Sequence, residues 1–258
     1  MDRVLSNVKS RSTRDLADSP RAGSNAPVTT ADAAQTARAR VREEFIDAAY
    51  RVIDTDGPRP SMDAIARAAG GSKPRLYRQF ADKHELYTAI AQRMREDIYR
   101  RVLPDFNFAL QSPMRSLRHA ITGYAEEIGG HPNVFRFLVL GSSTPSGEPG
   151  SFPLDIGREL AQRMQDLATA MLEAVHVDSS GIDYTAQAAV GSIVACTDLW
   201  LSKTPEDEPP PVQTFVDEVS DLVWGIIAAF LRRHKLDVDP DEPMFVALTR
   251  AQESAAKK

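Results

Sequence analysis

The sequence has very little cysteine: Cys196 is the only one in 258 residues, so the chain cannot form an intramolecular disulfide. No cysteines and histidines have the spacing of a zinc site. Long hydrophobic runs are also missing, since Phe137–Leu140 and Trp224–Leu231 are far shorter than the roughly 20 apolar residues that cross a bilayer. The first forty residues carry scattered charges, unlike a signal peptide. We therefore expect a cytoplasmic protein with no membrane segment, metal or cofactor.

Motifs of catalysis are absent as well. The sequence contains no nucleophile elbow, no phosphate-binding loop and no paired carboxylates at a catalytic spacing. We therefore expect no enzymatic activity, although an all-helical enzyme stays the less favoured alternative.

The charge is unevenly divided between the two parts of the chain. Residues 1–103 hold 19 Lys and Arg against 14 Asp and Glu, whereas residues 104–258 hold 12 against 22. The N-terminal part can therefore face a polyanion, and the remainder is poorly suited to one.

Apolar residues recur at helical spacing from about residue 36 to 235, and no segment alternates as a strand does. The pattern predicts an all-α protein with four helices between Val41 and Leu103 and five more beyond them. These five are expected over Met114–Ile128, Pro132–Leu140, Leu154–Val175, Ile182–Leu201 and Val212–Arg233. We expect a disordered arm at 1–35, a small helical domain at 36–103, a larger domain at 104–235 and a tail at 236–258.

Turn and capping residues punctuate the first four helices. Gly57 and Pro58 end the first, and Ser61 can cap the second. Ala69–Ser72, with its two glycines, separates the second helix from a short third one that has Pro74 in its first turn. Asp82 and Glu85 have the spacing of a capping box for the fourth. This arrangement is typical of a helix-turn-helix, whose second helix enters the major groove of DNA.

Polar side chains on the third helix suit DNA. Basic and amide groups can bind base edges, Pro74 can touch a thymine methyl, and the Tyr77 hydroxyl and the Lys83 ammonium can hold phosphates. The predicted DNA-binding residues are Ser72, Lys73, Pro74, Arg75, Tyr77, Arg78, Gln79, Lys83 and Arg42.

The segments Ser61–Ala66, Ala69–Phe80 and Asp82–Lys83 together resemble the DNA-binding domain of the TetR (tetracycline repressor) family. The resemblance implies DNA contacts by the residues matching Ser72, Lys73, Pro74, Arg75, Tyr77 and Lys83. Gly71 departs from the family pattern, which usually has a small aliphatic residue there, so we expect a looser turn.

The resemblance also implies a C-terminal ligand-binding and dimerisation domain, in which the last two helices pair with those of a second copy. Small residues suit such a contact: Ala188, Ala189, Gly191, Ala195, Gly225, Ala228 and Ala229. Packing within one chain explains the same residues nearly as well. Candidates for an apolar effector pocket are Tyr124, Phe135, Phe137, Met171, Tyr184 and Trp200.

The function that these features favour is a homodimeric transcriptional repressor. It would leave a palindromic double-stranded operator when a small molecule, apolar or lipid-like, binds. The main alternative is an architectural DNA-binding protein with no effector.

Overall fold

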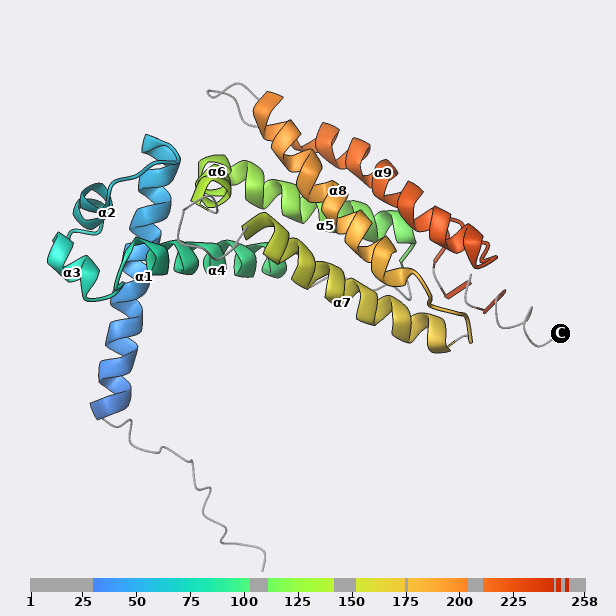
Figure 1. The fold of residues 1–258 in the computed structure, drawn as a ribbon, viewed down its shortest axis with the longest axis horizontal. Helices are drawn as coiled ribbons and strands as arrows, with labels where there is room; N and C mark the ends of the chain where they lie inside the picture. The colour runs from blue at the N-terminus through green and yellow to red at the C-terminus, as the bar shows by residue number, and fades with distance from the viewer. Residues whose placement is uncertain are drawn as a thin grey trace, which may run out of the picture. The chain divides into compact units, whose positions relative to one another are not determined.

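The computed structural model describes residues 30–102, 111–141, 152–174, 176–203, 211–243, 245–246 and 249–250. All regular secondary structure in these ranges is helical (Figure 1). The helices are α1 (Thr30–Asp56), α2 (Met62–Ala68), α3 (Lys73–Tyr77), α4 (Lys83–Val102), α5 (Pro113–Gly130), α6 (Pro132–Gly141), α7 (Phe152–Ala174), α8 (Ile182–Lys203) and α9 (Val212–Arg233). The predicted all-α fold is therefore confirmed. None of these helices is both long and apolar enough to cross a membrane.

Most helix ends lie where the turn and capping residues of the sequence predict them. Gly57 follows α1 with a φ of +92°, a conformation that favours glycine. The Ser61 hydroxyl accepts from the Ala64 amide at 3.1 Å and caps α2. Ser72 stands at the N-cap of α3 but makes no capping hydrogen bond through its side chain.

One expected boundary moves. Helix α1 begins at Thr30, so the last six residues of the arm expected at 1–35 are helical. Because Thr30–Gln35 includes three alanines, the helix can extend beyond the segment that the core holds. Residues 1–29 lie outside the described residues.

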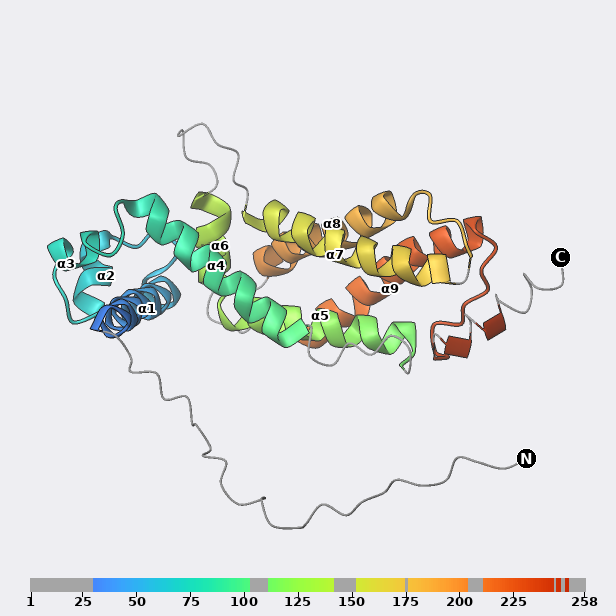
Figure 2. The same ribbon diagram turned by 90° about the horizontal axis from the view of Figure 1, so that it is seen from below.

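Beyond α4, long helices pack against one another. Helix α4 lies against α5, α5 against α9, α9 against α8, and α8 against α7 (Figures 1 and 2). Helix α4 thus belongs to both parts of the protein, because its first turn follows α3 and the rest of it packs on α5 (Figure 2).

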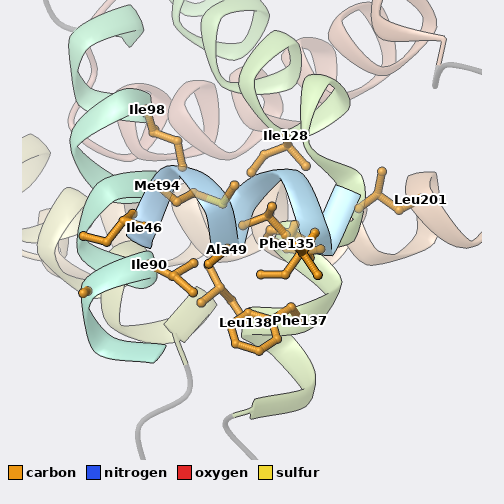
Figure 3. Packing of buried hydrophobic residues seen from close by; sticks show 14 of the residues in the cluster. Ile46, Ala49, Ile90, Met94, Ile98, Ile128, Phe135, Phe137, Leu138 and Leu201 are labelled. Carbon is orange, nitrogen blue, oxygen red and sulfur yellow. The ribbon is translucent and has the colours of Figure 1, made fainter. Parts of the chain in front are cut away.

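The hydrophobic core crosses the boundary expected at residue 103. A single cluster of buried side chains includes residues of α1 to α4 together with residues of α5, α6, α8 and α9. Figure 3 shows Ile46 and Ala49 of α1, Ile90, Met94 and Ile98 of α4, Ile128 of α5, Phe135, Phe137 and Leu138 of α6 and Leu201 of α8. A change of packing in the later helices can therefore be felt by α1 and α4.

Candidate nucleic-acid interface

The turn between α2 and α3 is closed by backbone hydrogen bonds. Gly70 has a φ of +64°, and its amide donates to the Arg67 carbonyl at 2.9 Å. The Gly71 amide donates to the Ala66 carbonyl, also at 2.9 Å. These bonds satisfy two backbone carbonyls at the end of α2. Gly70 adopts the left-handed conformation without strain because it has no Cβ. The turn is therefore well defined, although the sequence predicts a looser one.

Gly71 has a packing role rather than a conformational one. A Cβ added there would lie 3.3 Å from Cζ of the buried Phe45 and 3.5 Å from Cδ of Arg75. The missing side chain lets the turn approach α1 closely, and the stem of Arg75 passes over the space that results.

Two buried side chains orient α3. Leu76 is completely buried, and so is Phe80, which lies just beyond the helix and meets the Phe45 ring edge-to-face at 6.5 Å. Because α3 has only five residues, its stability comes from these contacts rather than from helix propensity. Burying this side of the helix turns the opposite side outward.

The outward side carries the polar residues that the sequence predicts. Ser72, Lys73, Pro74, Tyr77 and Arg78 are exposed, and Tyr77 remains 41% exposed despite its size. Arg75 and Gln79 are partly buried, whereas Lys83, the first residue of α4, is exposed. The structure thus brings eight of the nine predicted residues together on α3, its flanks and the start of α4.

The ninth, Arg42, points inward. Its guanidinium donates to the carbonyl of Gln79 at 2.6 Å and to the Glu85 carboxylate at 2.9 Å, and it stacks over the Phe80 ring at 4.2 Å. Proximity in sequence to other arginines suggested a DNA contact. In the structure this side chain joins α1 to the end of α3 and to α4.

Glu85, the carboxylate partner of Arg42, is predicted from the sequence as a capping residue but not as an ion-pair partner. Its amide donates to Asp82 Oδ1 at 2.8 Å, as a capping box requires, but its own carboxylate accepts from the Ala81 amide at 2.7 Å. The Ala81 amide and the Arg42 guanidinium lower the pKa of Glu85. The capping-box spacing reveals this residue, but no local pattern reveals Arg42 as its partner.

Carboxylates of α1 and α2 accompany the cations of α3. Lys73 Nζ lies 3.3 Å from Asp63, and Arg75 lies 4.0 Å from Glu44. The side chains of both pairs are 40–59% exposed. Solvent-exposed pairs of this kind add little stability, so the cations remain available to a polyanion.

Comparison with known proteins agrees with this geometry. Residues 45–90 match the family model described as bacterial regulatory proteins, tetR family. Residues 106–237 match the one described as tetracyclin repressor-like, C-terminal domain. The second match alone covers half of the chain. The protein belongs to the TetR family. It is a transcriptional regulator with a helix-turn-helix DNA-binding domain.

Individual relatives and solved structures resemble this chain. An uncharacterized HTH-type transcriptional regulator of Mycobacterium tuberculosis is 26% identical over 193 residues, 74% of this chain and 78% of the relative. The solved structure of a TetR-like transcriptional regulator from Rhodococcus sp. RHA1 is 28% identical in sequence and has a TM-score of 0.50. The match covers 73% of this chain and 96% of the Rhodococcus chain. A tetR-family regulator from Streptomyces coelicolor shares the fold, with a TM-score of 0.56 at 20% identity, over 83% and 89% of the two chains.

The residues expected to line an effector pocket of this TetR-family regulator lie in different surroundings. Tyr124 and Trp200 both pack on Phe215, with ring centroids at 6.5 and 4.5 Å. The Tyr124 hydroxyl bonds to Thr197 at 2.8 Å, and burial raises the pKa of Tyr124 to about 12. These aromatics form part of the core.

The remaining candidates are dispersed. Phe137 is buried against Tyr87, at 5.7 Å between ring centroids, and Met171 is partly buried on α7. Tyr184 is 79% exposed and is not a pocket wall within the protomer, because it lies on the outer side of α8. These residues were predicted from their type, because aromatic and methionine side chains line apolar pockets, and residue type does not reveal which sides of the helices face inward.

One cavity, of about 230 Å³, lies between α6 and α8 and contains one predicted residue, Phe135. Its other lining residues are Pro58, Arg136, Val139, Leu140, Asp198, Leu201 and Ser202. Pro58 belongs to the loop after α1, so this cavity touches both the DNA-binding helices and the C-terminal helices. Its walls are mainly apolar, and it is smaller than the roughly 300–1,000 Å³ typical of ligand pockets.

A polar contact lies beside the same junction. His131 Nδ1 is 2.7 Å from the Asp54 carboxylate at the end of α1, and Asn133 donates to the Asp54 carbonyl at 3.1 Å. The His131 ring packs edge-on against Tyr50 at 5.5 Å. The hydrogen bond and the charge of Asp54, with more distant Glu127 and Asp97, raise the pKa of His131 although burial opposes it. Protonation of His131 therefore strengthens the contact between α1 and the start of α6.

Proposed function

We propose that this regulator acts as a homodimeric repressor that binds a palindromic operator and leaves it when a small apolar molecule binds. The observation that carries the proposal is the outward side of α3. Lys73 and Arg78 are exposed there and Arg75 and Gln79 are partly exposed, whereas the opposite side is anchored by completely buried Leu76 and Phe80. A rigid helix with its polar side exposed is what readout of the major groove requires.

Different residues have different tasks in this proposal. Arg75, Arg78 and Gln79 read base edges, because guanidinium and amide groups match the donor and acceptor pattern of guanine and adenine. Lys83 and Tyr77, together with Ser72, hold phosphates and set the position of the helix on the duplex. Arg42 keeps α3 in place and touches no DNA.

The dimer contact is assigned to the outer sides of α8 and α9. Tyr184 and Leu199 of α8 are 79% and 52% exposed, and Leu222 of α9 is 55% exposed. A Cβ added at Gly191 or Gly225 would meet no atom within 4 Å, so both glycines leave open space in the protomer. Large apolar side chains beside open glycines suit close packing of helices from a second copy.

The effector site is assigned to the cavity between α6 and α8. Its walls include Phe135, Val139 and Leu201, and it borders Pro58, in the loop that follows α1. A ligand that enlarges this cavity would push α6 against α1 and thereby shift α3 from its position in the DNA complex. The affinity for DNA and the affinity for the ligand would then decrease by the same factor.

Binding of the protein to DNA upstream of its own gene tests the proposed DNA interface. In footprints at matched salt, Arg75→Ala should lose about 1–3 kcal/mol and relax the preference for particular bases. Lys83→Ala should weaken binding to all duplexes alike and flatten the salt dependence. Arg115→Ala removes the same charge from an exposed site on α5 and should behave as wild type. If Arg75→Ala and Lys83→Ala both footprint as wild type does, the proposed interface is wrong.

A thermal-shift screen of small apolar compounds tests the proposed effector site. Compounds that stabilise the protein should release DNA, and Val139→Trp, which fills the cavity, should abolish both effects while DNA binding persists. If no compound both stabilises the protein and releases DNA, the architectural alternative is favoured.

A further inference from the structure

We propose that Glu44 and Asp63 are specificity-determining residues, which act as built-in counter-ions to the DNA-reading helix and suppress its binding to non-specific DNA. The proposal rests on the DNA-binding function proposed above. It concerns residues that carry the wrong charge to touch DNA themselves.

Glu44 contacts two cations at once. One of its carboxylate oxygens lies 3.6 Å from Arg40, one turn earlier in α1, and the other lies 4.0 Å from Arg75 in α3. Asp63, in the first turn of α2, lies 3.3 Å from Lys73. Lys73 and Arg75, the two cations within α3, thus each have a carboxylate from a different helix.

The path of Arg75 explains why Glu44 is its partner. The Cδ atom of Arg75 lies 3.5 Å from the position that a Cβ of Gly71 would occupy, so its stem passes back over the turn toward α1. A larger residue at position 71 would crowd this path. Gly71 therefore permits the pairing of Arg75 with Glu44.

The physical consequence concerns binding more than folding. Both pairs are about half exposed to solvent, where an ion pair contributes little to stability. Non-specific affinity, however, comes almost entirely from cations that neutralise phosphates. A carboxylate within 4 Å of Arg75 competes with a phosphate for that cation and also repels the phosphate.

Specific binding is less affected. A guanine edge offers Arg75 two hydrogen bonds in a fixed geometry, which a mobile phosphate contact does not match. Glu44 should therefore lower non-specific affinity more than operator affinity and increase the ratio between them. That ratio governs occupancy in a genome full of competing sites.

Glu43 offers a matched control. It precedes Glu44 on α1, and its side chain is 52% exposed against 48% for Glu44. Glu43 pairs with Arg93 of α4, whereas Glu44 pairs with Arg75 of α3. Glu43→Gln and Glu44→Gln remove the same charge from neighbouring positions. The difference between them isolates the pairing with Arg75 and Arg40 from the change in net charge.

The test measures the binding of the purified full chain to a random-sequence duplex and to an operator selected from genomic DNA, over a range of salt. Glu44→Gln should bind the random duplex about three- to tenfold more tightly, with a salt slope steeper by about 0.9, the value for one more phosphate contact. Operator affinity should increase less, so the specificity ratio falls. Glu43→Gln should change non-specific affinity less than twofold, and Asp63→Asn should shift it in the same direction as Glu44→Gln.

Other results would overturn the proposal. Equal effects of Glu43→Gln and Glu44→Gln would show that only net charge matters. Weaker binding of Glu44→Gln to both duplexes would show that Glu44 positions Arg75 for binding rather than competing for it. In either case wild type still binds its operator, and the proposed function stands. If wild type binds neither duplex, the proposed function fails, and this inference fails with it.

Discussion

Arg42 of α1 and Glu85 of α4 are joined by a hydrogen bond of 2.9 Å, although 43 residues separate them. The same guanidinium donates to the carbonyl of Gln79, just beyond α3, at 2.6 Å. One side chain therefore ties three helices of the DNA-binding unit together. Both hydrogen bonds come from one guanidinium nitrogen, Nη1, while the planar group stacks on the Phe80 ring. Lysine is shorter and has no planar group to stack, so it cannot keep the two hydrogen bonds and the stacking together.

Arg42→Lys should therefore weaken operator binding by about 1–2 kcal/mol, as expected for loss of a charge-assisted hydrogen bond, even though the charge is kept. The slope of affinity against salt should stay unchanged, because no phosphate contact is lost. Titration of a labelled operator at several salt concentrations measures both quantities. Arg40→Lys, two residues earlier on the same helix, should behave as wild type. An unchanged affinity of Arg42→Lys would instead favour a simple phosphate contact by Arg42.

The pairing of His131 with Asp54 predicts a pH dependence of stability. Because Asp54 raises the pKa of His131 in the folded state, folding favours the protonated ring. The contribution is complete below the unfolded pKa of about 6.5 and is lost as the pH rises through the higher folded pKa. The midpoint of thermal unfolding, measured by circular dichroism, should therefore differ most between wild type and His131→Asn near pH 6 and less at pH 9.

Asp54→Asn is the companion variant for the same measurement. Without the carboxylate, the folded-state pKa of His131 loses its main cause of elevation, so the difference between pH 6 and pH 9 should largely disappear. If Asp54→Asn retains the full pH dependence, another group is responsible.

At Gly123, α5 approaches α4 closely. A Cβ at this position would lie 3.0 Å from the backbone carbonyl oxygen of Arg101, which cannot move without moving α4. Gly123→Ala should therefore reduce the free energy of unfolding by about 1–3 kcal/mol in urea titrations, despite the better helix propensity of alanine. Gly130→Ala, in the same helix but with no atom within 4 Å of the added Cβ, should cost nothing. Equal effects of the two substitutions would mean that α4 and α5 can separate freely.

Gly225 tests the proposed dimer. It is exposed on α9 with open space around it, so Gly225→Leu should leave the protomer folded and improve its local helix propensity. In a dimer packed through α8 and α9, the same side chain would hold the two copies apart and reduce association. Sedimentation velocity should show wild type as a dimer and the variant shifted to monomer at the same concentration. Gly130→Leu, exposed on α5, should remain dimeric. A wild-type monomer at micromolar concentration would exclude the dimer.

Local signals in the sequence predict the elements well. Ser61, the glycines at 70 and 71 and Asp82 with Glu85 act through bonds to residues within a few positions, so their effects are visible in a short window. The same holds for the exposed side of α3, because residues two positions apart on a helix point to roughly opposite sides, which separates Leu76 from Pro74 and Arg78. Eight of the nine predicted DNA-binding residues consequently lie together around α3.

The sequence by itself determined the all-helical fold, the helix-turn-helix and the outward cations, because these depend on periodicity and on contacts between near neighbours. Only the tertiary structure decided that Arg42 faces Gln79 and Glu85, that Glu44 accompanies Arg75, and that Tyr184 lies on the surface while Trp200 is in the core. These features depend on which sides of distant helices meet. That choice is made by the packing of the whole core, where each side chain is placed by partners many residues away.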